Sequence, residues 1–341
     1  MKSERFRWYT YGLFSLALFG AMLLCVCAGS VSVPAGDTLS VLWNALCGKP
    51  SPDGISGAII LSVRLPRVFC VALIGAALSL CGAAMQGLLR NPLADGSTLG
   101  VSSGASLGAV MAIAFGVSIP SLPYAGTMAM AMLFAFLSLM LILFLAYLLD
   151  KSLSTSSIIL IGVIFSMFAS SVISLIIAFA GEKLKSITFW TMGSLSGSNY
   201  AYALILALAL LICGAVILRC SQELNAFAVG EDNARSVGVP VRRVKLTILI
   251  AVSVLIGISV SVGGTIGFVG LVTPHIARMI VGPNHKKLLP ASMFSGAVFL
   301  LLADLVGRTL VSPIELPIGV VTSLVGSVIF VIVFYKNRRK G

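Results

Sequence analysis

The sequence predicts an all-α polytopic membrane protein with about ten transmembrane helices and both termini in the cytoplasm. Of its 341 residues, 58% are hydrophobic and 10% are charged, whereas soluble domains carry about 25% charged residues. Apolar runs long enough to cross a bilayer recur along the whole chain, and the charged residues gather at their ends. Because no polar stretch is long enough for a separate soluble domain, we expect residues 1–341 to form a single membrane domain.

Turn residues and charges divide the chain into ten apolar segments. The first is too long for the core of a signal peptide and lacks a cleavage site, so we expect it to be retained as a span. The third is rich in glycine and the eighth is short, and these two are the least regular. The expected spans are residues 8–33, 65–89, 93–116, 124–148, 156–179, 200–219, 244–263, 267–281, 290–311 and 316–335.

The basic residues predict the orientation of these spans. The net charge is +12, but the sequence has no basic cluster with interleaved aromatic residues that would indicate nucleic-acid binding. When ten spans alternate across the membrane, most of the 23 lysines and arginines fall on the side of the two termini. Cytoplasmic loops are enriched in Lys and Arg, so both termini are expected inside.

Local signals predict where several helices begin. Asn91-Pro92 and Thr273-Pro274 each have the pattern of an N-cap followed by a proline in the first helical turn. The polar residues 154–156 can cap the fifth span. The external loop 34–58 has room for a short helix.

Small residues form regular rows on the second and third spans. The second span carries a small residue every four positions from Gly75 to Gly87, and the third does so from Gly100 to Gly108. Such rows form a helix face on which a neighbouring backbone can approach closely in lipid. We therefore assign helix packing in a pathway wall to Gly75, Gly82, Gly100, Gly104 and Gly108.

Three arginines are expected near the outer surface. Asp304 and Arg308 are four residues apart, the offset of an intrahelical ion pair, and Arg308 falls near the outer end of the ninth span. Arg64 and Arg67 stand at the outer end of the second span. Two interpretations remain open: the side chains snorkel at the membrane surface, or they face outward as anchors for an acidic partner, which suits bidentate pairing with carboxylates.

The sequence argues against catalysis and metal binding in this chain. Residues 100–104 match the GxSxG pattern of serine hydrolases, so Ser102 or Ser103 would be the nucleophile of an intramembrane hydrolase. A nucleophile needs a base within hydrogen-bond reach, and the two histidines, His275 and His285, form no motif with these serines. We therefore assign this segment to packing. The seven cysteines show no CxxC pattern and are expected to pack as small apolar residues.

The energy for transport is expected to come from another chain. The sequence has no GxxxxGK[ST] motif and hence no P-loop that could bind ATP. Apart from Asp304, no expected span carries a mid-membrane Asp, Glu or Lys, whereas ion-driven transporters usually need such groups. An ATP-independent secondary transporter or channel stays an alternative.

The cytoplasmic loop 219–243 is the only long polar stretch of the sequence. Residues 223–237 have helical character that Gly230 interrupts. A helix outside the membrane between two spans suits a docking surface, and a solvated connector is the alternative.

Several motifs, in order and over nearly the whole chain, resemble those of the FecCD-type permeases. They are Arg64-Leu-Pro-Arg67, Gly82-Ala-Ala-Met-Gln86, Asn91-Pro-Leu-Ala94, Gly100-Val-Ser-Ser-Gly104, Trp190-Thr-Met-Gly193, Gly230-Glu-Asp-Asn-Ala234-Arg235, the segment from Gly267 to Arg278, Asp304 and Glu315-Leu-Pro-Ile-Gly319. That family comprises the membrane subunits of bacterial ABC importers for ferric siderophores, haem and cobalamin. The resemblance implies ten spans in the ABC importer type II permease fold and a place in the bacterial inner membrane.

The resemblance also implies partners. Two permease subunits, expected to be identical, would form the pathway at their interface, and two ATPase subunits would bind ATP and Mg²⁺ below them. The chain itself is then not an enzyme and needs no cofactor or metal. A soluble periplasmic or lipid-anchored binding protein would deliver a metal-chelate cargo. The expected function is import of a ferric siderophore, with haem or cobalamin as alternatives.

The resemblance finally implies roles for named residues. Arginines of the family that dock on glutamates of the binding protein correspond to Arg64, Arg67 and Arg308. A cytoplasmic coupling segment, about residues 223–240, would contact the ATPase through Gly230, Glu231, Ala234, Arg235 and Gly238, with Glu231 and Arg235 facing it. The cytoplasmic gate corresponds to Asn91, Leu93, Ser154, Thr155 and Ser156. The chain departs from the family at Asp95-Gly96, where relatives often have a proline nearby, and no motif marks the residues that contact cargo.

Overall fold

The computed structural model describes residues 8–31, 33–49, 55–117, 125–151 and 154–338. Within these ranges the chain folds into helices, and no β-strand occurs. In chain order the elements are α1 (Trp8–Cys27), α2 (Ala35–Leu46), α3 (Ile55–Ala58), a π-helical turn (Ile59–Arg64), α4 (Leu65–Leu88), a 3₁₀ turn (Gly96–Leu99), α5 (Val101–Phe115), α6 (Ala125–Leu149), α7 (Thr155–Ala178), a second 3₁₀ turn (Gly181–Lys183), α8 (Leu184–Thr191), α9 (Tyr200–Arg219), α10 (Ser221–Val229), α11 (Glu231–Ser236), α12 (Val241–Gly263), α13 (Val269–Val281), α14 (His285–Thr309) and α15 (Ile318–Arg338).

Seven helices in the described ranges are long and apolar enough to cross a membrane. They are α1, the continuous helix Ser56–Leu88 that ends in α4, α6, α7, α9, α12 and α14. The apolar parts of α5, α13 and α15 that the structure describes are shorter than a full crossing. Each expected span coincides with one of these helices, which confirms the all-α membrane fold. The number of ten complete spans stays a prediction.

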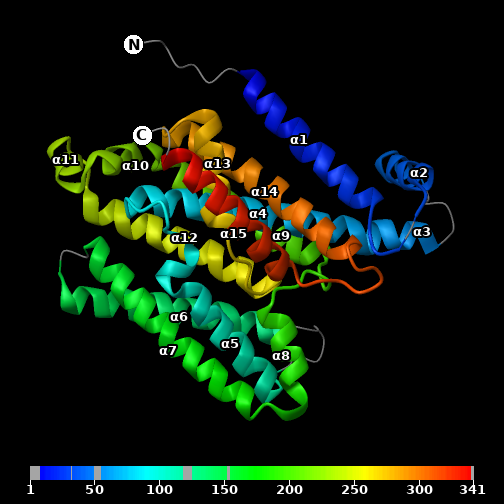
Figure 1. Ribbon diagram of the computed structural model, residues 1–341, viewed down its shortest axis with the longest axis horizontal. Helices are drawn as coiled ribbons and strands as arrows, with labels where there is room; N and C mark the ends of the chain where they lie inside the picture. Colours follow the sequence, from blue (N-terminus) through cyan, green and yellow to red (C-terminus); the bar gives the residue numbers. More distant parts are fainter. Residues whose placement is uncertain (1–7, 32, 50–54, 118–124, 152–153, 339–341) are drawn as a thin grey trace.

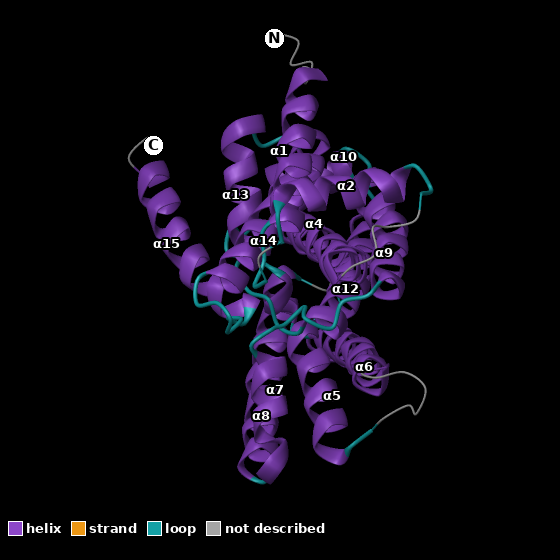
Figure 2. Cartoon of the chain, turned by 90° about the vertical axis from the view of Figure 1, so that its right-hand side faces the viewer, coloured by secondary structure: helices purple, strands orange, loops and turns teal. Residues whose placement is uncertain are grey.

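Helix α4 lies at the centre of the molecule (Figures 1 and 2), where it packs against α14, α13, α12 and α9. Of the 18 most apolar consecutive residues in the helix Ser56–Leu88, 83% are buried, whereas only 22% of the corresponding residues of α7 are buried. Helices α5, α6 and α7 form a group on one side of this centre (Figure 1), and α1 packs on α14. The chain is therefore built from a buried central helix and a peripheral group in which α6 and α7 keep apolar faces open.

Glycines let α4 touch its neighbours almost backbone to backbone. A Cβ atom added at Gly82 would clash with the carbonyl group of Gly270 in α13, and one added at Gly75 would clash with that of Gly296 in α14. Such crossings have the small-residue interfaces that are typical of helix association in membranes. These two glycines therefore set the closest approaches of α4.

The row of small residues on the third span is shorter than expected. Gly104 and Gly108 of α5 leave no room for a side chain against Ser138 and Met130 of α6. Gly100 instead precedes the helix with a φ of 73°, a left-handed conformation that glycine adopts without strain. Gly100 still packs closely, because a Cβ atom added there would lie 2.9 Å from the carbonyl oxygen of Gly162 in α7, but it does so from the turn that leads into α5.

The helix start expected at Asn91-Pro92 is wrong. The Asn91 side chain accepts a hydrogen bond from the Leu93 N–H at 2.9 Å, which closes a turn, and the next α-helix begins only at Val101. An asparagine can satisfy a nearby backbone donor in a turn as well as at a helix N-cap. The residues 91–100 therefore form an irregular hairpin between α4 and α5.

The helix start expected at Thr273-Pro274 is also wrong, because α13 begins at Val269 and continues through this pair. A proline has no N–H to donate to the carbonyl of Gly270 one turn earlier. The side chain of Gln86 in α4 donates to that carbonyl oxygen at 3.3 Å. A tertiary contact thus replaces the hydrogen bond that the proline removes.

Two other local expectations are confirmed, and two helix boundaries differ from the expected ones. The Ser154 side chain accepts a hydrogen bond from the Ser157 N–H at 3.4 Å, which confirms the cap of α7. The external loop contains α2, as expected. Helix α1 ends at Cys27, earlier than expected, and α14 begins earlier, at His285, with Pro290 inside it.

Candidate functional site

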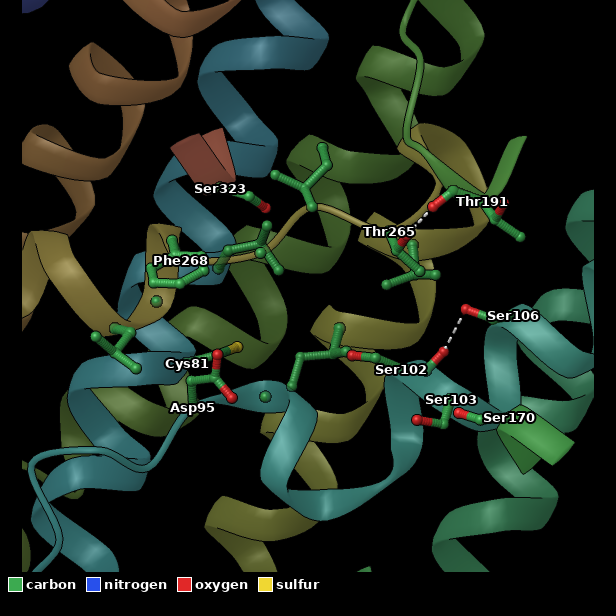
Figure 3. Close-up of a pocket in the computed structure, with 18 of the residues that line it drawn as sticks. Cys81, Asp95, Ser102, Ser103, Ser106, Ser170, Thr191, Thr265, Phe268 and Ser323 are labelled. Carbon is green, nitrogen blue, oxygen red and sulfur yellow. Dashed lines mark hydrogen bonds between the residues drawn. The ribbon is translucent and has the colours of Figure 1, made fainter. Parts of the chain in front are cut away.

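A cavity of about 640 Å³ opens between α5 and α7 on one side and α12 and α13 on the other (Figure 3). Residues of α4 and α15 and of the 91–100 hairpin complete its wall. Hydroxyl groups are the commonest polar feature of the lining, and they belong to Ser102, Ser103, Ser106, Ser170, Ser174, Ser323, Thr191 and Thr265.

The rest of the lining is mostly apolar. Leu78, Ile256, Val260 and Leu271 contribute aliphatic surface, and Asp95 is the one carboxylate among the residues that line the cavity. No Lys, Arg or His is among these lining residues. Small-molecule sites commonly combine apolar walls with a few placed polar groups. The cavity can therefore hold a large molecule through apolar contact and hydroxyl hydrogen bonds, without a cationic group to capture a small anion.

Phe268 is a strained point of this wall. Its φ is 65°, in the left-handed region that bulky residues rarely adopt, and it immediately precedes α13. A Cβ atom added at Gly326 of α15 would lie 2.6 Å from the Cβ atom of Phe268. Strained residues are enriched at functional sites, and here the strain places an aromatic side chain between α15 and the cavity (Figure 3).

The packing role expected for residues 100–104 holds for Gly104 but is wrong for Ser102 and Ser103, which line the cavity (Figure 3). Their signal in the sequence is the spacing of hydroxyl groups. Ser102 and Ser106 on α5 are four residues apart, and so are Ser170 and Ser174 on α7. Residues at that spacing share a helix face, so the pattern indicates a polar face on each helix.

The outer ends of α4 and α14 meet in a buried ion network. Asp304 pairs with Arg308 at 2.8 Å, which confirms the expected intrahelical pair. The same carboxylate pairs with Arg67 of α4 at 2.9 Å. Arg67 also pairs with Glu315 at 2.8 Å. A buried charge needs a close opposite charge, and one aspartate here serves two arginines.

The remaining donors of these arginines bind the end of α1. Arg64 donates to the carbonyl oxygens of Val26 at 2.8 Å, Cys27 at 3.0 Å and Val31. Arg308 donates to those of Cys25 and Ala28, both at 3.3 Å. The last carbonyl groups of a helix have no partner within the helix, and the two guanidinium groups supply one.

The expectation that the three arginines face outward is therefore wrong for this structure. Arg64 is 4% exposed, Arg67 8% and Arg308 3%, because carboxylates and helix carbonyls inside the chain occupy their donors. The sequence missed Glu315 as a partner of Arg67, since the two lie 248 positions apart. Docking of a binding protein on these residues stays a prediction.

The coupling segment folds into α10 and α11 at the cytoplasmic side. Both carboxylate oxygens of Glu231 accept hydrogen bonds from Lys245 of α12, at 2.9 and 3.0 Å, and the Lys245 side chain is 1% exposed. Glu231 therefore ties α11 to α12, and because its side chain is still 29% exposed, its contact with a partner stays a prediction. Arg235 contacts Glu231 only at 3.7 Å, and its side chain is 56% exposed.

Glycine and alanine give this segment its shape. Gly230 has a φ of 138° and Gly238 a φ of 88°, so each end of α11 has a backbone conformation that side chains disfavour. Ala234 is fully buried between these ends. The Arg90 guanidinium lies 4.0 Å from the position of a Cβ atom added at Gly230, so the hairpin after α4 adjoins the coupling segment.

The expected gate residues lie at the hairpin and at the start of α7. Leu93 is 49% exposed and lines the cavity, whereas Asn91 forms the turn before it. Thr155 and Ser156 follow the cap Ser154 in the first turn of α7, and Ser156 is exposed. The structure thus places Leu93 in the cavity wall, and the gating role of this group stays a prediction.

Comparisons with known proteins match nearly the whole chain. The sequence model of the FecCD transport family matches residues 16–336. The ABC transporter permease protein YvrB of Bacillus subtilis is 43% identical, over 100% of this chain and 97% of the relative. The molybdate import system permease protein MolB of Haemophilus influenzae is 37% identical, over 95% and 96% of the two chains. The vitamin B12 import system permease protein BtuC of Klebsiella pneumoniae is 35% identical, over 100% and 97%.

A solved structure shares the fold. It is described as an inward-facing conformation of a transporter assigned to the metal-chelate ABC type. The TM-score is 0.83 with 34% sequence identity, and the match covers 96% of this chain and 98% of the other. The cargoes in the names of two relatives differ, molybdate in one and vitamin B12 in the other.

Proposed function

Since the chain belongs to the FecCD transport family of ABC importer permeases, we propose that it imports a metal chelate, and specifically a ferric siderophore. The chain is a multi-pass protein of the cytoplasmic membrane, and as a permease it works with ATPase and substrate-binding partners. Haem and cobalamin are the alternative cargoes, and the vitamin B12 permease among the relatives favours cobalamin of the two.

The hydroxyl-rich cavity is the observation that carries this proposal. Its volume of about 640 Å³ lies in the range of about 300–1,000 Å³ that is usual for small-molecule pockets. A siderophore complex presents many polar atoms on a large surface, which suits eight hydroxyl groups set in apolar walls. A molybdate ion is small and doubly charged, and no cationic side chain among the lining residues matches it.

The test is uptake by proteoliposomes that hold the chain with the ATPase and binding protein that copurify with it. Labelled ferric siderophore, haem, cobalamin and molybdate are supplied in turn with ATP inside the vesicles. We expect the ferric siderophore to accumulate. Accumulation of cobalamin or molybdate alone would overturn the cargo proposal.

Two variants of α7 test the role of the cavity itself. Both serines are exposed in the isolated chain, but Ser174 lines the cavity and Ser171 lies outside the lining. We expect Ser174→Leu to slow uptake and Ser171→Leu to leave it near the wild-type rate, because only the first change narrows the cavity. Equal rates for both variants would contradict a pathway through this cavity.

We expect two copies of the chain to enclose the pathway. Helices α7 and α15 contribute Ser170 and Ser323 to the cavity. Within one chain, however, only 22% of the most apolar 18 residues of α7 are buried. A second permease subunit on that side would cover this apolar surface and close the cavity. Cross-linking between cysteines introduced on α7 tests this arrangement, and a single copy per purified complex would contradict it.

Two contacts carry motion from the coupling segment in this proposal. Arg90 adjoins Gly230, so a shift of α11 reaches the hairpin that holds Leu93. The Glu231–Lys245 pair joins α11 to α12, and α12 carries Ile256 in the cavity wall. ATP and Mg²⁺ bound by the ATPase would move α11, and both contacts would pass that movement to the cavity.

Dependence on an ATPase separates this proposal from a secondary transporter. Vesicles that contain the chain alone are tested for uptake under a proton or sodium gradient. We expect none without the ATPase and ATP. Uptake driven by an ion gradient alone would establish the alternative.

We propose that docking uses the outer arginine network by exchange of carboxylates. Glu315 is the most accessible acid of the network, with a side chain 32% exposed. A carboxylate of the binding protein could replace Glu315 at Arg67, because Asp304 would remain to hold the arginine in place. Reversal of all three arginines would instead disrupt a buried network, so Glu315 is the informative position for a docking test.

A further inference from the structure

The first turns of α12 border a groove of about 870 Å³ on the cytoplasmic side. Arg235 of α11 and Arg242 and Arg243 of α12 line its upper part. Leu246 and Ile250, one and two turns farther along α12, line its lower part. The groove therefore runs from three positive charges to an apolar wall. We call it the basic groove.

The arginines of the basic groove lack a close counter-charge. Arg242 and Arg243 are exposed, and neither forms an ion pair in the part of the chain that the structure describes. Arg235 lies 3.7 Å from Glu231, but that carboxylate is held more closely by Lys245, at 2.9 Å. The groove thus presents a positive charge that the fold itself does not neutralise.

One of these arginines is held in place by an aromatic ring. The Cζ atom of Arg242 lies 5.5 Å from the centroid of the Tyr147 ring, a cation–π distance. Tyr147 is in the last turn of α6, whose Leu148 is 63% exposed. Tyrosines at the ends of membrane spans lie at the level of lipid headgroups. This contact places Arg242 at the membrane boundary.

The lower wall is apolar and belongs to a helix long enough to span the membrane. Ile250 is 45% exposed and belongs to the apolar part of α12, so its side chain faces lipid or another apolar surface. A water-soluble partner at the upper part of the groove would leave this wall uncovered. A lipid covers both parts, because its headgroup is charged and its chains are apolar.

We propose that the basic groove binds an anionic phospholipid, with the headgroup phosphate on Arg242 and Arg243 and an acyl chain along Leu246 and Ile250. Arginine pairs with phosphate oxygens through two parallel N–H donors, and basic pockets at the cytoplasmic ends of spans suit such headgroups. This proposal needs only a chain that spans the membrane and does not depend on the cargo.

The test measures lipid retained by the intact importer complex in nanodiscs, with phosphatidylglycerol diluted into phosphatidylcholine. Native mass spectrometry counts the bound lipids for wild type, Arg242→Gln/Arg243→Gln and Arg219→Gln/Lys286→Gln. The last variant also removes two exposed cytoplasmic charges, but outside the groove. We expect the affinity for phosphatidylglycerol to fall about 30-fold in the groove variant and to change less than about 3-fold in the control.

Three outcomes would overturn the proposal. Equal loss in the two variants would mean that the affinity reflects net charge alone. Displacement of the lipid by inorganic phosphate at the same concentration would mean that the groove binds a free anion and does not use its apolar wall. Unchanged retention in the groove variant, with hydrogen exchange of residues 240–250 slowed by the ATPase and not by lipid, would assign the groove to a protein contact. Arg242→Lys/Arg243→Lys, which keeps the charge, verifies that loss does not come from misfolding.

Discussion

The two ends of the molecule differ in how much of their positive charge is neutralised by groups of the same chain. At the outer end, the three arginines of the buried ion network are at most 8% exposed, and Asp304, Glu315 and the carbonyls of α1 occupy their donors. At the cytoplasmic end, Lys245 is buried against Glu231, while the arginines of the basic groove stay exposed. The outer end is neutralised from within, and the cytoplasmic end leaves positive charge for an external ligand.

This difference determines how an external charged partner can bind at each end. A buried ion is costly unless a partner lies close to it, so the outer network must stay paired until a carboxylate from outside can replace an internal one. Exposed arginines are solvated by water and need no internal partner. A partner that docks at the outer end must therefore exchange its carboxylate for an internal one, whereas a ligand at the cytoplasmic end can bind the exposed arginines without displacing any group of the chain.

The largest effect is expected at Asp304, which is shared by two arginines. The change Asp304→Asn leaves Arg67 and Arg308 buried with less counter-charge and is expected to lower the free energy of unfolding by about 3–5 kcal/mol. Denaturant unfolding in detergent micelles measures this change. Asp37→Asn, at an exposed position of α2, serves as the control. A loss of less than about 1 kcal/mol, as for a surface pair, would break the distinction between the ends.

The pair at the cytoplasmic end is expected to respond unequally to its two deletions. Glu231→Gln takes the counter-charge from a lysine that is 1% exposed, whereas Lys245→Met leaves a glutamate that is 29% exposed to water. We expect losses of about 3 kcal/mol and about 1 kcal/mol. Both variants are also expected to transport less cargo per ATP hydrolysed, since α11 loses its tie to α12.

The exchange Glu231→Lys/Lys245→Glu separates the effect of the ion pair on coupling from the effect of either charge alone. It restores an ion pair in the opposite sense and is expected to recover coupling in part. Coupling that stays at the wild-type level in all three variants would remove the pair from the transmission of movement.

A smaller effect on stability is expected at Glu315. The direction in which its substitution changes the affinity for the binding protein is the informative result. Arg67 keeps Asp304 at 2.9 Å when Glu315 is neutralised, so Glu315→Gln is expected to cost less than about 1 kcal/mol. The same change removes an internal competitor and is expected to tighten binding-protein affinity about 5-fold. Titration of the binding protein on nanodiscs measures it, and weaker binding would mean that Glu315 itself contributes to the docking surface.

The smallest effect on stability is expected at Arg235, whose side chain is 56% exposed. Arg235→Glu is expected to change the free energy of unfolding by less than about 0.5 kcal/mol and still to lower uptake per ATP. The ratio of uptake to hydrolysis in proteoliposomes measures this. Unchanged coupling would mean that Arg235 makes no contact with the ATPase that transport needs.

The helices were predictable because their signals are local. An apolar run needs no knowledge of its neighbours to favour a membrane span, and each expected span coincides with a helix of the structure. The pair Asp304–Arg308 was predictable for the same reason, since four positions on one helix fix its geometry. The helix starts at Asn91 and Thr273 were not, because each residue type is also typical of turns and helix interiors.

The site was predictable only in part. Gly104 and Ser102 are two positions apart, yet one packs against α6 and the other lines the cavity. A row of small residues shows that a face exists but not which neighbour will lie on it. Glu231 belongs to a polar segment, and only the position of Lys245 on α12 shows that its carboxylate is bound within the chain.

The membrane-spanning character of the chain and the places of its helices follow from the residues alone, because transfer into lipid depends on local composition. The partners of the charged groups and the walls of the cavity follow from the packing of the helices. Arg67 and Asp304 are 237 positions apart, and the hydroxyl groups of the cavity come from helices distant in the chain. Contacts of that range depend on how α4 packs among its neighbours, and glycine-to-glycine crossings such as Gly82 on Gly270 set that packing.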